Sequence, residues 1–180
     1  MLRAIGLIAV ALLLVSCGSG KKQAGTAVSN CRAAGGTGDV SRPGGAETRY
    51  LASVNVEALE CADRVAFGFV EGSPPAGYTV SYQPESTAKI EDGSGNPVEI
   101  AGSAFLVVRL TPAATARIVG EKLKFTYKGP RRLPGNGARH VQEVVKTGDF
   151  EAAVTWVIGL DEQRNFAVST SGSQLSVDIG

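Results

Sequence analysis

The sequence has few of the residues that carry metal-binding or acid–base chemistry. Its 180 residues include a single His, His140, and three Cys. One His cannot form a histidine-pair zinc site, and too few Cys are left for a thiolate cluster. The sequence also has no Gly-x-Ser-x-Gly elbow and no phosphate-binding loop. We therefore expect a protein that is not an enzyme, with no cofactor and no metal ion. His140 opens a predicted strand, which favours a structural or surface role over the alternative of a catalytic base.

Neither sign of charge is in excess. Lys and Arg number 18 against 17 Asp and Glu, which gives a net charge of +1. Arg3 is the one charged residue in the first sixteen, so a chain without this segment is neutral. Binding to nucleic acid through phosphates needs a basic excess. We therefore exclude nucleic acid as a partner.

No apolar run is long enough to form a permanent membrane span. The longest, from Ala4 to Val15, has about twelve residues, whereas a bilayer requires about twenty. With Arg3 before it and Ser16 after it, this run is typical of a secretory signal peptide, which we assign to residues 1–16. The protein is therefore expected to be exported.

The signal peptide is followed directly by Cys17. Leu14, Val15, Ser16 and Cys17 together resemble a bacterial lipobox, whose cysteine is acylated before the leader is removed. The two chains of a diacylglyceryl group, one source of palmitate, are enough for stable anchoring. We expect a lipoprotein anchored through Cys17 to the outer face of the cell membrane. The alternative is an ordinary secreted protein with an unrelated cysteine.

Residues 17–46 contain almost no bulky apolar side chains and cannot form a core. We interpret them as the acylated N-terminus and a flexible tether. Two further cysteines, Cys31 and Cys61, lie in the tether and just before a predicted strand. Exported cysteine pairs usually join, so we expect a Cys31–Cys61 disulfide, with two free thiols as the alternative. Residues 47–180 are enough for one domain with one core.

From residue 47 onward, short β-prone segments alternate with turn residues, which predicts an all-β domain. Trp156, the single Trp, lies in the longest β-prone run and marks the expected central strand, with Val154 and Ile158 on the same inner face. The other face of this strand carries both polar and apolar side chains, so we expect the rest of the chain to cover it only partly. The one helix expected is 111–117, with Pro112 at its first position. The predicted strands are 49–56, 64–70, 78–83, 98–100, 105–110, 123–127, 141–147, 151–158, 166–169 and 175–179.

Alternating apolar positions identify the inner faces of four other predicted strands. These positions are Val65, Phe67 and Phe69; Tyr78, Val80 and Tyr82; Leu106, Val108 and Leu110; and Leu175, Val177 and Ile179.

Residues 92–96 have alternating oxygen ligands, as a calcium loop does. Pro97 occupies the position where such a loop needs Gly for its sharp turn, and Ser103 the position of the bidentate Glu. We therefore expect a Gly-rich connection between strands.

The most polarised segment is 121–139, with six cations against the single acid Glu121. Attraction to an anionic polymer or to a lipid surface outside the membrane is the functional interpretation. The alternative is that these are solubilising charges on an edge strand, where Lys is common. The cations are Lys122, Lys124, Lys128, Arg131, Arg132 and Arg139.

Several stretches together resemble the AMIN-like domain of actinobacterial lipoproteins, and more distantly the AMIN domain of cell-wall amidases. The most distinctive are Asp63-Arg64 and the Gly-Asp-Phe-Glu turn at 148–151. The others are 61–67, 77–82, 102–108, 127–130, 156–160 and 175–178. The resemblance runs from about Glu47 to the C-terminus and implies a β-sandwich that localises proteins in the envelope, with peptidoglycan affinity in the amidase case.

We therefore expect an envelope module that binds a cell-wall glycan such as peptidoglycan. Its expected contacts are Lys122, Lys124, Lys128, Arg131 and Arg132. The alternative is a scaffolding module in which an exposed strand edge pairs with a partner protein of the envelope.

Overall fold

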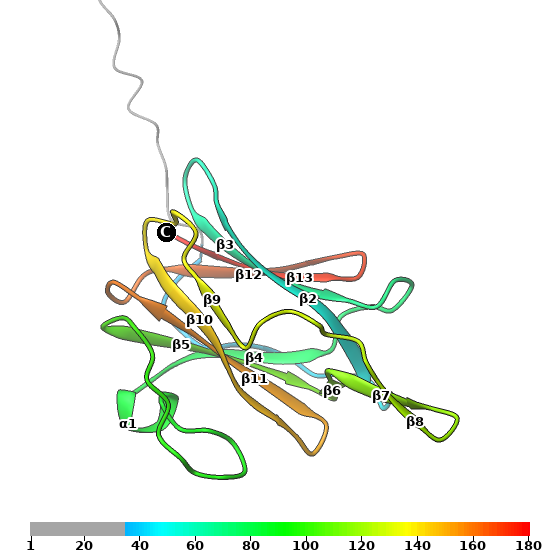
Figure 1. Ribbon diagram of the computed structural model, residues 1–180. Coiled ribbons are helices and arrows are strands. Elements are labelled where there is room, and N and C mark those ends of the chain that lie inside the picture. The colour runs from blue at the N-terminus through cyan, green and yellow to red at the C-terminus, as the bar shows by residue number, and fades with distance from the viewer. Residues whose placement is uncertain (1–34) are drawn as a thin grey trace, which may run out of the picture.

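The computed structural model describes residues 35–180. They form two β-sheets packed face to face, with a separate hairpin at one end (Figure 1). In spatial order, the six-stranded sheet consists of β1 (Val40–Arg42), β4 (Gly77–Gln83), β5 (Ala104–Thr111), β11 (Ala153–Leu160), β10 (Val141–Phe150) and β9 (Arg132–Pro134). The five-stranded sheet consists of β12 (Phe166–Ser171), β13 (Gln174–Ile179), β3 (Asp63–Phe69), β2 (Arg49–Ala58) and β6 (Ala113–Ala114). The hairpin pairs β7 (Ala116–Val119) with β8 (Lys122–Phe125).

The prediction of an all-β sandwich is confirmed. Strands account for 55% of the described residues and helix for 3%. The one helix described is α1 (Glu85–Ala88). Strand pairs are antiparallel apart from β2 and β6, which run parallel through Arg49 and Tyr50.

The inner faces follow the predicted alternation. One buried cluster contains the predicted inner positions of β3, β13 and β5, together with Val80 of β4. These positions are Val65, Phe67 and Phe69; Leu175, Val177 and Ile179; and Leu106, Val108 and Leu110. Tyr78 and Tyr82 pack against its edge. This cluster lies between the two sheets, and both sheets lie within the described residues, so this part of the chain contains a complete core.

The strand β11 is central, as predicted, because it lies between β5 and β10. Val154, Trp156 and Ile158 face the other sheet. The expectation that its second face is only partly covered is wrong, since all eight of its residues are buried. Val157 on that face packs in a second cluster with Ala88 of α1 and with Ile100. The long connection between β4 and β5 thus covers the outer face of the sheet.

The helix predicted at 111–117 does not form. The Thr111-Pro112 peptide bond is cis, and Ala113 and Ala114 pair with β2. The carbonyl of Pro112 accepts a hydrogen bond from Arg49 N, and Ala113 N donates to Ala152 O. Because these backbone groups are used between segments far apart in sequence, local helix propensity is overridden.

The strand predicted at 98–100 is also absent. Residues 98–100 have no ladder partner, and the segment is held by an isolated bridge between Ile90 and Pro97. Val98 and Ile100 are instead the apolar side chains that cover the sheet from outside. Their alternation with Glu99 gives a strand-like pattern without a strand.

The domain begins before residue 47. The strand β1 lies within the predicted tether 17–46 but pairs with β4, through Val40 and Val80 among others. Such a short edge strand has too few apolar residues to be recognised by periodicity. Cys17, Cys31 and the signal peptide lie outside the described residues, so acylation and the Cys31–Cys61 disulfide stay predictions. Within residues 35–180, no helix has the length and apolar character that crossing a bilayer would require.

Candidate functional site

A shallow pocket lies where the end of β10 meets the loop that follows α1. Its volume is about 310 Å³. Its lining residues are Glu91, Asp92, Arg131, Lys146, Thr147, Gly148, Asp149 and Phe150. The lining therefore combines three carboxylates, two cations and one aromatic ring.

Arg131 forms one wall of the pocket and is held from two sides. Its Nη2 lies 2.6 Å from Oε1 of Glu91, and its Nε donates to the carbonyl of Lys146 at 2.9 Å. The other carboxylate oxygen of Glu91 accepts from Ser94 Oγ at 2.7 Å. The hydrogen bond from Ser94 and the charge of Arg131 lower the pKa of Glu91. Both groups are thus charged and oriented at neutral pH.

Two aspartates also line the pocket. Asp92 Oδ2 accepts from Thr155 Oγ1 at 2.6 Å and lies 3.3 Å from Arg109 Nη1. Asp149 accepts from Thr115 Oγ1 and lies 3.2 Å from Lys146 Nζ. The pocket therefore consists of paired charges, and its net charge is small.

The chain reaches this geometry through Gly148 and the β10–β11 turn. A Cβ on Gly148 would lie 2.1 Å from Asp92 Oδ2, so a side chain there would displace the carboxylate. Glu151 and Ala152 form the turn with φ values of 49° and 55°, which match a two-residue type I′ hairpin. This turn leaves the ring of Phe150 58% exposed at the pocket edge.

This arrangement suits binding rather than catalysis. Its carboxylates are tied to cations and hydroxyls, and the one His of the described chain bonds Asp161 rather than a group of the pocket. Paired acids and bases offer both acceptors and donors at fixed positions, and an exposed aromatic ring offers a flat apolar surface. A neutral, hydroxyl-rich ligand such as a sugar matches both features. In residues 35–180, no group of three or more His, Cys, Asp or Glu is arranged to hold a metal ion.

The structure does not bring the five predicted contacts together. Arg131 lines the pocket, whereas Lys122 and Lys124 lie on β8 and Lys128 in the loop after it. Arg132 pairs with Glu143 and donates to the carbonyl of Glu99 at 2.7 Å. Glu143 also accepts from Ala101 N, so Arg132 helps to fasten the outer segment onto β10.

The other pocket residues were not identified as ligand contacts from the sequence. Asp149 and Phe150 belong to the Gly-Asp-Phe-Glu stretch, which was recognised only as a turn. Asp92 matches one position of a calcium loop, but its stretch is predicted to be a Gly-rich connection between strands. The signal that was available is an aromatic residue in a polar turn, since Phe at such a position has no local core to enter.

The comparison with known proteins gives one match. The sequence matches the model of the AMIN-like domain family over residues 49–180. The chain belongs to this family. No curated protein and no solved structure matches it. AMIN-like domains are in general non-catalytic envelope modules, which fits a peptidoglycan-associated, exported protein at the level of the family.

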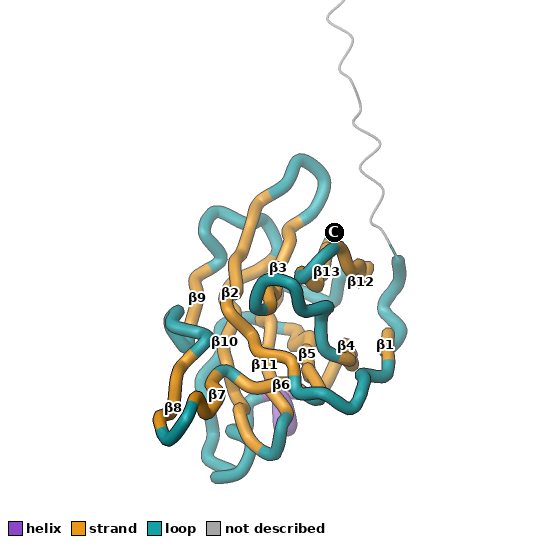
Figure 2. Tube along the Cα trace, turned by 90° about the vertical axis from the view of Figure 1, so that its right-hand side faces the viewer, coloured by secondary structure: helices purple, strands orange, loops and turns teal. Residues whose placement is uncertain are grey.

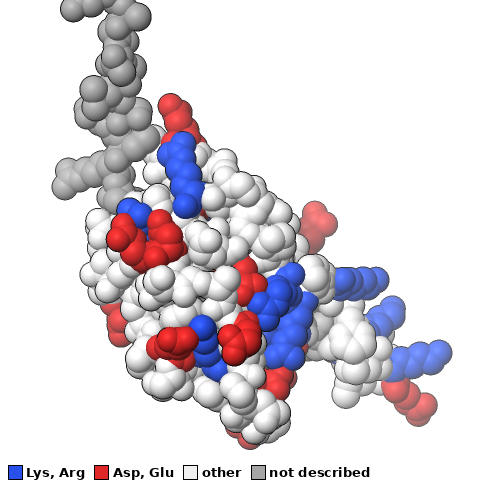
Figure 3. Space-filling model, turned by 60° about the vertical axis from the view of Figure 1, so that its left-hand side comes forward, with Lys and Arg blue, Asp and Glu red and all other residues white. Residues whose placement is uncertain are grey.

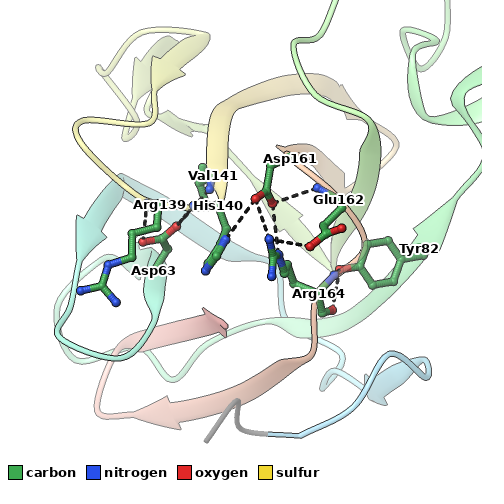
Figure 4. A network of polar contacts seen from close by, with 8 residues as sticks. All are labelled: Asp63, Tyr82, Arg139, His140, Val141, Asp161, Glu162 and Arg164. Carbon is green, nitrogen blue, oxygen red and sulfur yellow. Dashed lines mark hydrogen bonds and ion pairs between the residues drawn. The ribbon is translucent and has the colours of Figure 1, made fainter. Parts of the chain in front are cut away.

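The most distinctive motif of this AMIN-like domain, Asp63-Arg64, has a structural role. Asp63 is fully buried and accepts three backbone hydrogen bonds at the start of β10 (Figure 4). The donors are Arg139 N at 3.0 Å, His140 N at 2.6 Å and Val141 N at 3.0 Å. Arg64 forms a bidentate pair with Asp178 of the neighbouring strand, at 2.6 and 2.8 Å. Asp63 therefore ties the five-stranded sheet to the six-stranded one.

His140 belongs to the same network of the AMIN-like domain. Its Nδ1 lies 3.2 Å from Asp161 Oδ2, and Arg164 Nη2 lies 2.8 Å from the same atom (Figure 4). Arg164 is fixed in turn by Tyr82, whose hydroxyl accepts from Arg164 N at 2.9 Å and donates to Arg164 O at 2.7 Å. These contacts hold the β11–β12 connection.

We expect Asp161 to make stability depend on acid pH. The hydrogen bond from Arg164, assisted by that from His140, lowers the pKa of Asp161 from 3.8 to about 2. A carboxylate with a lowered pKa stabilises the fold fully above its unfolded value and loses this contribution as pH falls toward its folded value. Asp161→Asn should therefore flatten the fall in unfolding free energy between about pH 4 and pH 2. Urea unfolding across that range measures it.

Asp39→Asn is the control, because it removes an exposed carboxylate ahead of β1. Its pH profile should follow the wild type. Parallel profiles for Asp161→Asn and the wild type would contradict the assignment of this pH dependence to Asp161.

Proposed function

We propose that this chain is a non-catalytic, lipid-anchored module of the cell envelope that binds a cell-wall glycan in the pocket beside Phe150. The family supports the coarser part of this proposal, an envelope module associated with peptidoglycan. The geometry of the pocket supports the finer part, the binding of a glycan beside Phe150.

The observation that carries the proposal is the exposed ring of Phe150 beside fixed, paired charges. An aromatic ring beside fixed polar groups can stack on an apolar face of a ligand while those groups bind its polar atoms. Here the ring is 58% exposed and adjoins Arg131, Lys146 and Asp149, which are oriented by their own partners. A sugar ring has an apolar face for the aromatic ring and hydroxyls for the charged groups. Because the charges are already paired, little reorganisation is needed when the ligand binds.

Anchoring belongs to the same proposal. Acylation of Cys17 would keep the domain at the outer face of the cell membrane, and a Cys31–Cys61 disulfide would shorten the tether. The predicted contacts Lys122, Lys124, Lys128 and Arg132 lie outside the pocket, and their attraction to an anionic wall polymer stays a prediction.

The test is co-sedimentation of the non-acylated chain 18–180 with purified cell wall. We expect the wild type to pellet, and Phe150→Ala and Arg131→Gln each to weaken binding by about five- to tenfold, the effect of removing a contact worth about 1 kcal/mol. Binding should persist at high salt, because the ligand of this pocket is neutral.

Phe125→Ala is a matched control, since it removes an equally exposed ring outside the pocket. It should pellet as the wild type does. Absence of wall binding by the wild type, together with recovery of one specific protein in a pull-down, would reject the glycan proposal in favour of a scaffolding module. Equal pelleting of wild type and Phe150→Ala would reject the pocket as the site.

A further inference from the structure

The β7–β8 hairpin is set apart from the sandwich. Its strands pair with each other alone, as a two-stranded sheet (Figure 2). Gly120, with φ of 64°, and Glu121 form its two-residue turn. Opposite residues of an antiparallel pair share a face, so the register gives this hairpin two different faces.

One face is apolar and exposed. The register places Ile118 opposite Leu123 and Ala116 opposite Phe125, and these four residues alternate with the other face. The exposed fraction is 76% for Ile118 and 61% for both Leu123 and Phe125. Three of the five large apolar side chains exposed on the described chain thus lie side by side. Scattered apolar residues need no explanation, but a contiguous group of this kind marks an interaction surface.

The other face is basic. It carries Arg117 opposite Lys124 and Val119 opposite Lys122, with Glu121 as the one acid of the hairpin. Neither Lys122 nor Lys124 has an ion-pair partner within the described chain, whereas Arg131 and Arg132 are paired with Glu91 and Glu143. In Figure 3, cations lie beside acids on the body of the domain, and further cations extend from its right edge together with an acid.

We propose that the β7–β8 hairpin binds the surface of a membrane that contains anionic phospholipid. An apolar face flanked by Lys and Arg is the pattern of segments that lie in the membrane interface, with the apolar side chains among acyl groups and the cations at the phosphates. Lys and Arg stems are long enough to reach the phosphates while their apolar neighbours are immersed. Ile118, Leu123 and Phe125 supply the apolar contact, and Arg117, Lys122 and Lys124 supply the charge.

A second copy of the chain fits this surface less well. The open edge of β8 could pair with β8 of another copy, but Lys122 and Lys124 of both copies would then lie close together. Like charges opposite each other across a strand pair are destabilising. An anionic surface meets the same cations without this cost.

The position of the hairpin is compatible with an anchor at Cys17. The described chain starts beside β12, at the end of the molecule opposite the hairpin, as Figures 1 and 2 both show. The 10 residues of β2, which run between these ends, span about 33 Å. Even with Cys31 joined to Cys61, the 14 residues from Cys17 to Cys31 could extend to about 46 Å. This segment is therefore long enough for the domain to lie along the membrane with its hairpin in contact.

The test is flotation of the non-acylated chain 18–180 with vesicles. The probes are vesicles of one part phosphatidylglycerol to two parts phosphatidylcholine, and vesicles of phosphatidylcholine alone. We expect the wild type to prefer the anionic vesicles by on the order of tenfold, and high salt to weaken that binding. The double variants Lys122→Glu/Lys124→Glu and Leu123→Ser/Phe125→Ser should each lower binding to anionic vesicles by about tenfold.

Arg42→Glu is the control for charge, because it removes an exposed cation on β1, at the other end of the domain. It should bind as the wild type does, and circular dichroism should show every variant folded. Equal binding to neutral and anionic vesicles, or hairpin variants that float like the wild type, would overturn the proposal. Absence of binding to either vesicle would also overturn it.

Discussion

Asp63→Ala is expected to lower the free energy of unfolding by about 3–5 kcal/mol, because three backbone N–H groups lose their acceptor at a cost of about 1–3 kcal/mol each. Asp63 has no exposed surface and accepts hydrogen bonds from three successive backbone amides, of Arg139, His140 and Val141. Hydrogen bonds to a charged group are worth about 1.5–3 kcal/mol each and are not additive. Alanine would leave all three N–H groups without their acceptor.

Urea unfolding followed by circular dichroism measures this loss. Asp63→Asn keeps one acceptor oxygen and the shape of the side chain, so its cost should be smaller than that of Asp63→Ala. Asp178→Ala is a second comparison, since it breaks a pair whose side chains are 32% and 22% exposed and should cost about 1 kcal/mol. A cost for Asp63→Ala no larger than that for Asp178→Ala would show that Asp63 does not hold the two sheets together.

Trp156→Ala is expected to have a similarly large effect, about 3–5 kcal/mol, the usual cost of emptying a buried aromatic site. Trp156 is fully buried on the central strand and packs edge-on against two rings, Phe67 at 6.3 Å and Tyr127 at 5.5 Å between centroids. These contacts join the central strand to the opposite sheet and to the loop after the hairpin. The sandwich would have to collapse across both layers to fill the space.

Trp156→Phe separates the ring from its N–H group. The indole Nε1 is buried without a hydrogen-bond partner among the described residues, so phenylalanine removes an unsatisfied donor as well as some volume. Its cost should therefore be less than half that of Trp156→Ala. Circular dichroism is again the measurement, because these variants remove the single Trp. Equal costs for the two substitutions would contradict the packing role of the ring.

The sequence predicted the features of the fold that depend on neighbours along the chain. Two-residue alternation identified the buried side chains of β3, β5 and β13 and the inner face of β11 around Trp156, since side chains of a strand point to opposite sides in turn. The sandwich arrangement was predicted from the resemblance of several stretches to the AMIN-like domain. The sequence did not predict the polar pocket, because the residues that line it, among them Asp92, Arg131 and Asp149, come from three separate segments of the chain.

The interactions between distant segments were settled by the tertiary structure alone. The stretch 111–117 has a proline and alanines suited to a helix, but pairing with β2 uses its backbone instead. The second face of β11 is buried because the connection between β4 and β5 folds across it. No local sequence pattern predicts this contact.

The basic segment 121–139 shows most clearly which properties follow from the sequence and which depend on tertiary contacts. The sequence determined that the segment 121–139 concentrates positive charge, because charge is a property of each residue. Only the fold brings Glu91, 40 positions away, to Arg131 and Glu143 to Arg132, and so compensates two of these cations. It leaves Lys122 and Lys124 without an ion-pair partner among residues 35–180, on a hairpin whose opposite face is apolar. Charge pairing acts through space over a few ångströms, so which cations stay available to a ligand is fixed by tertiary contacts.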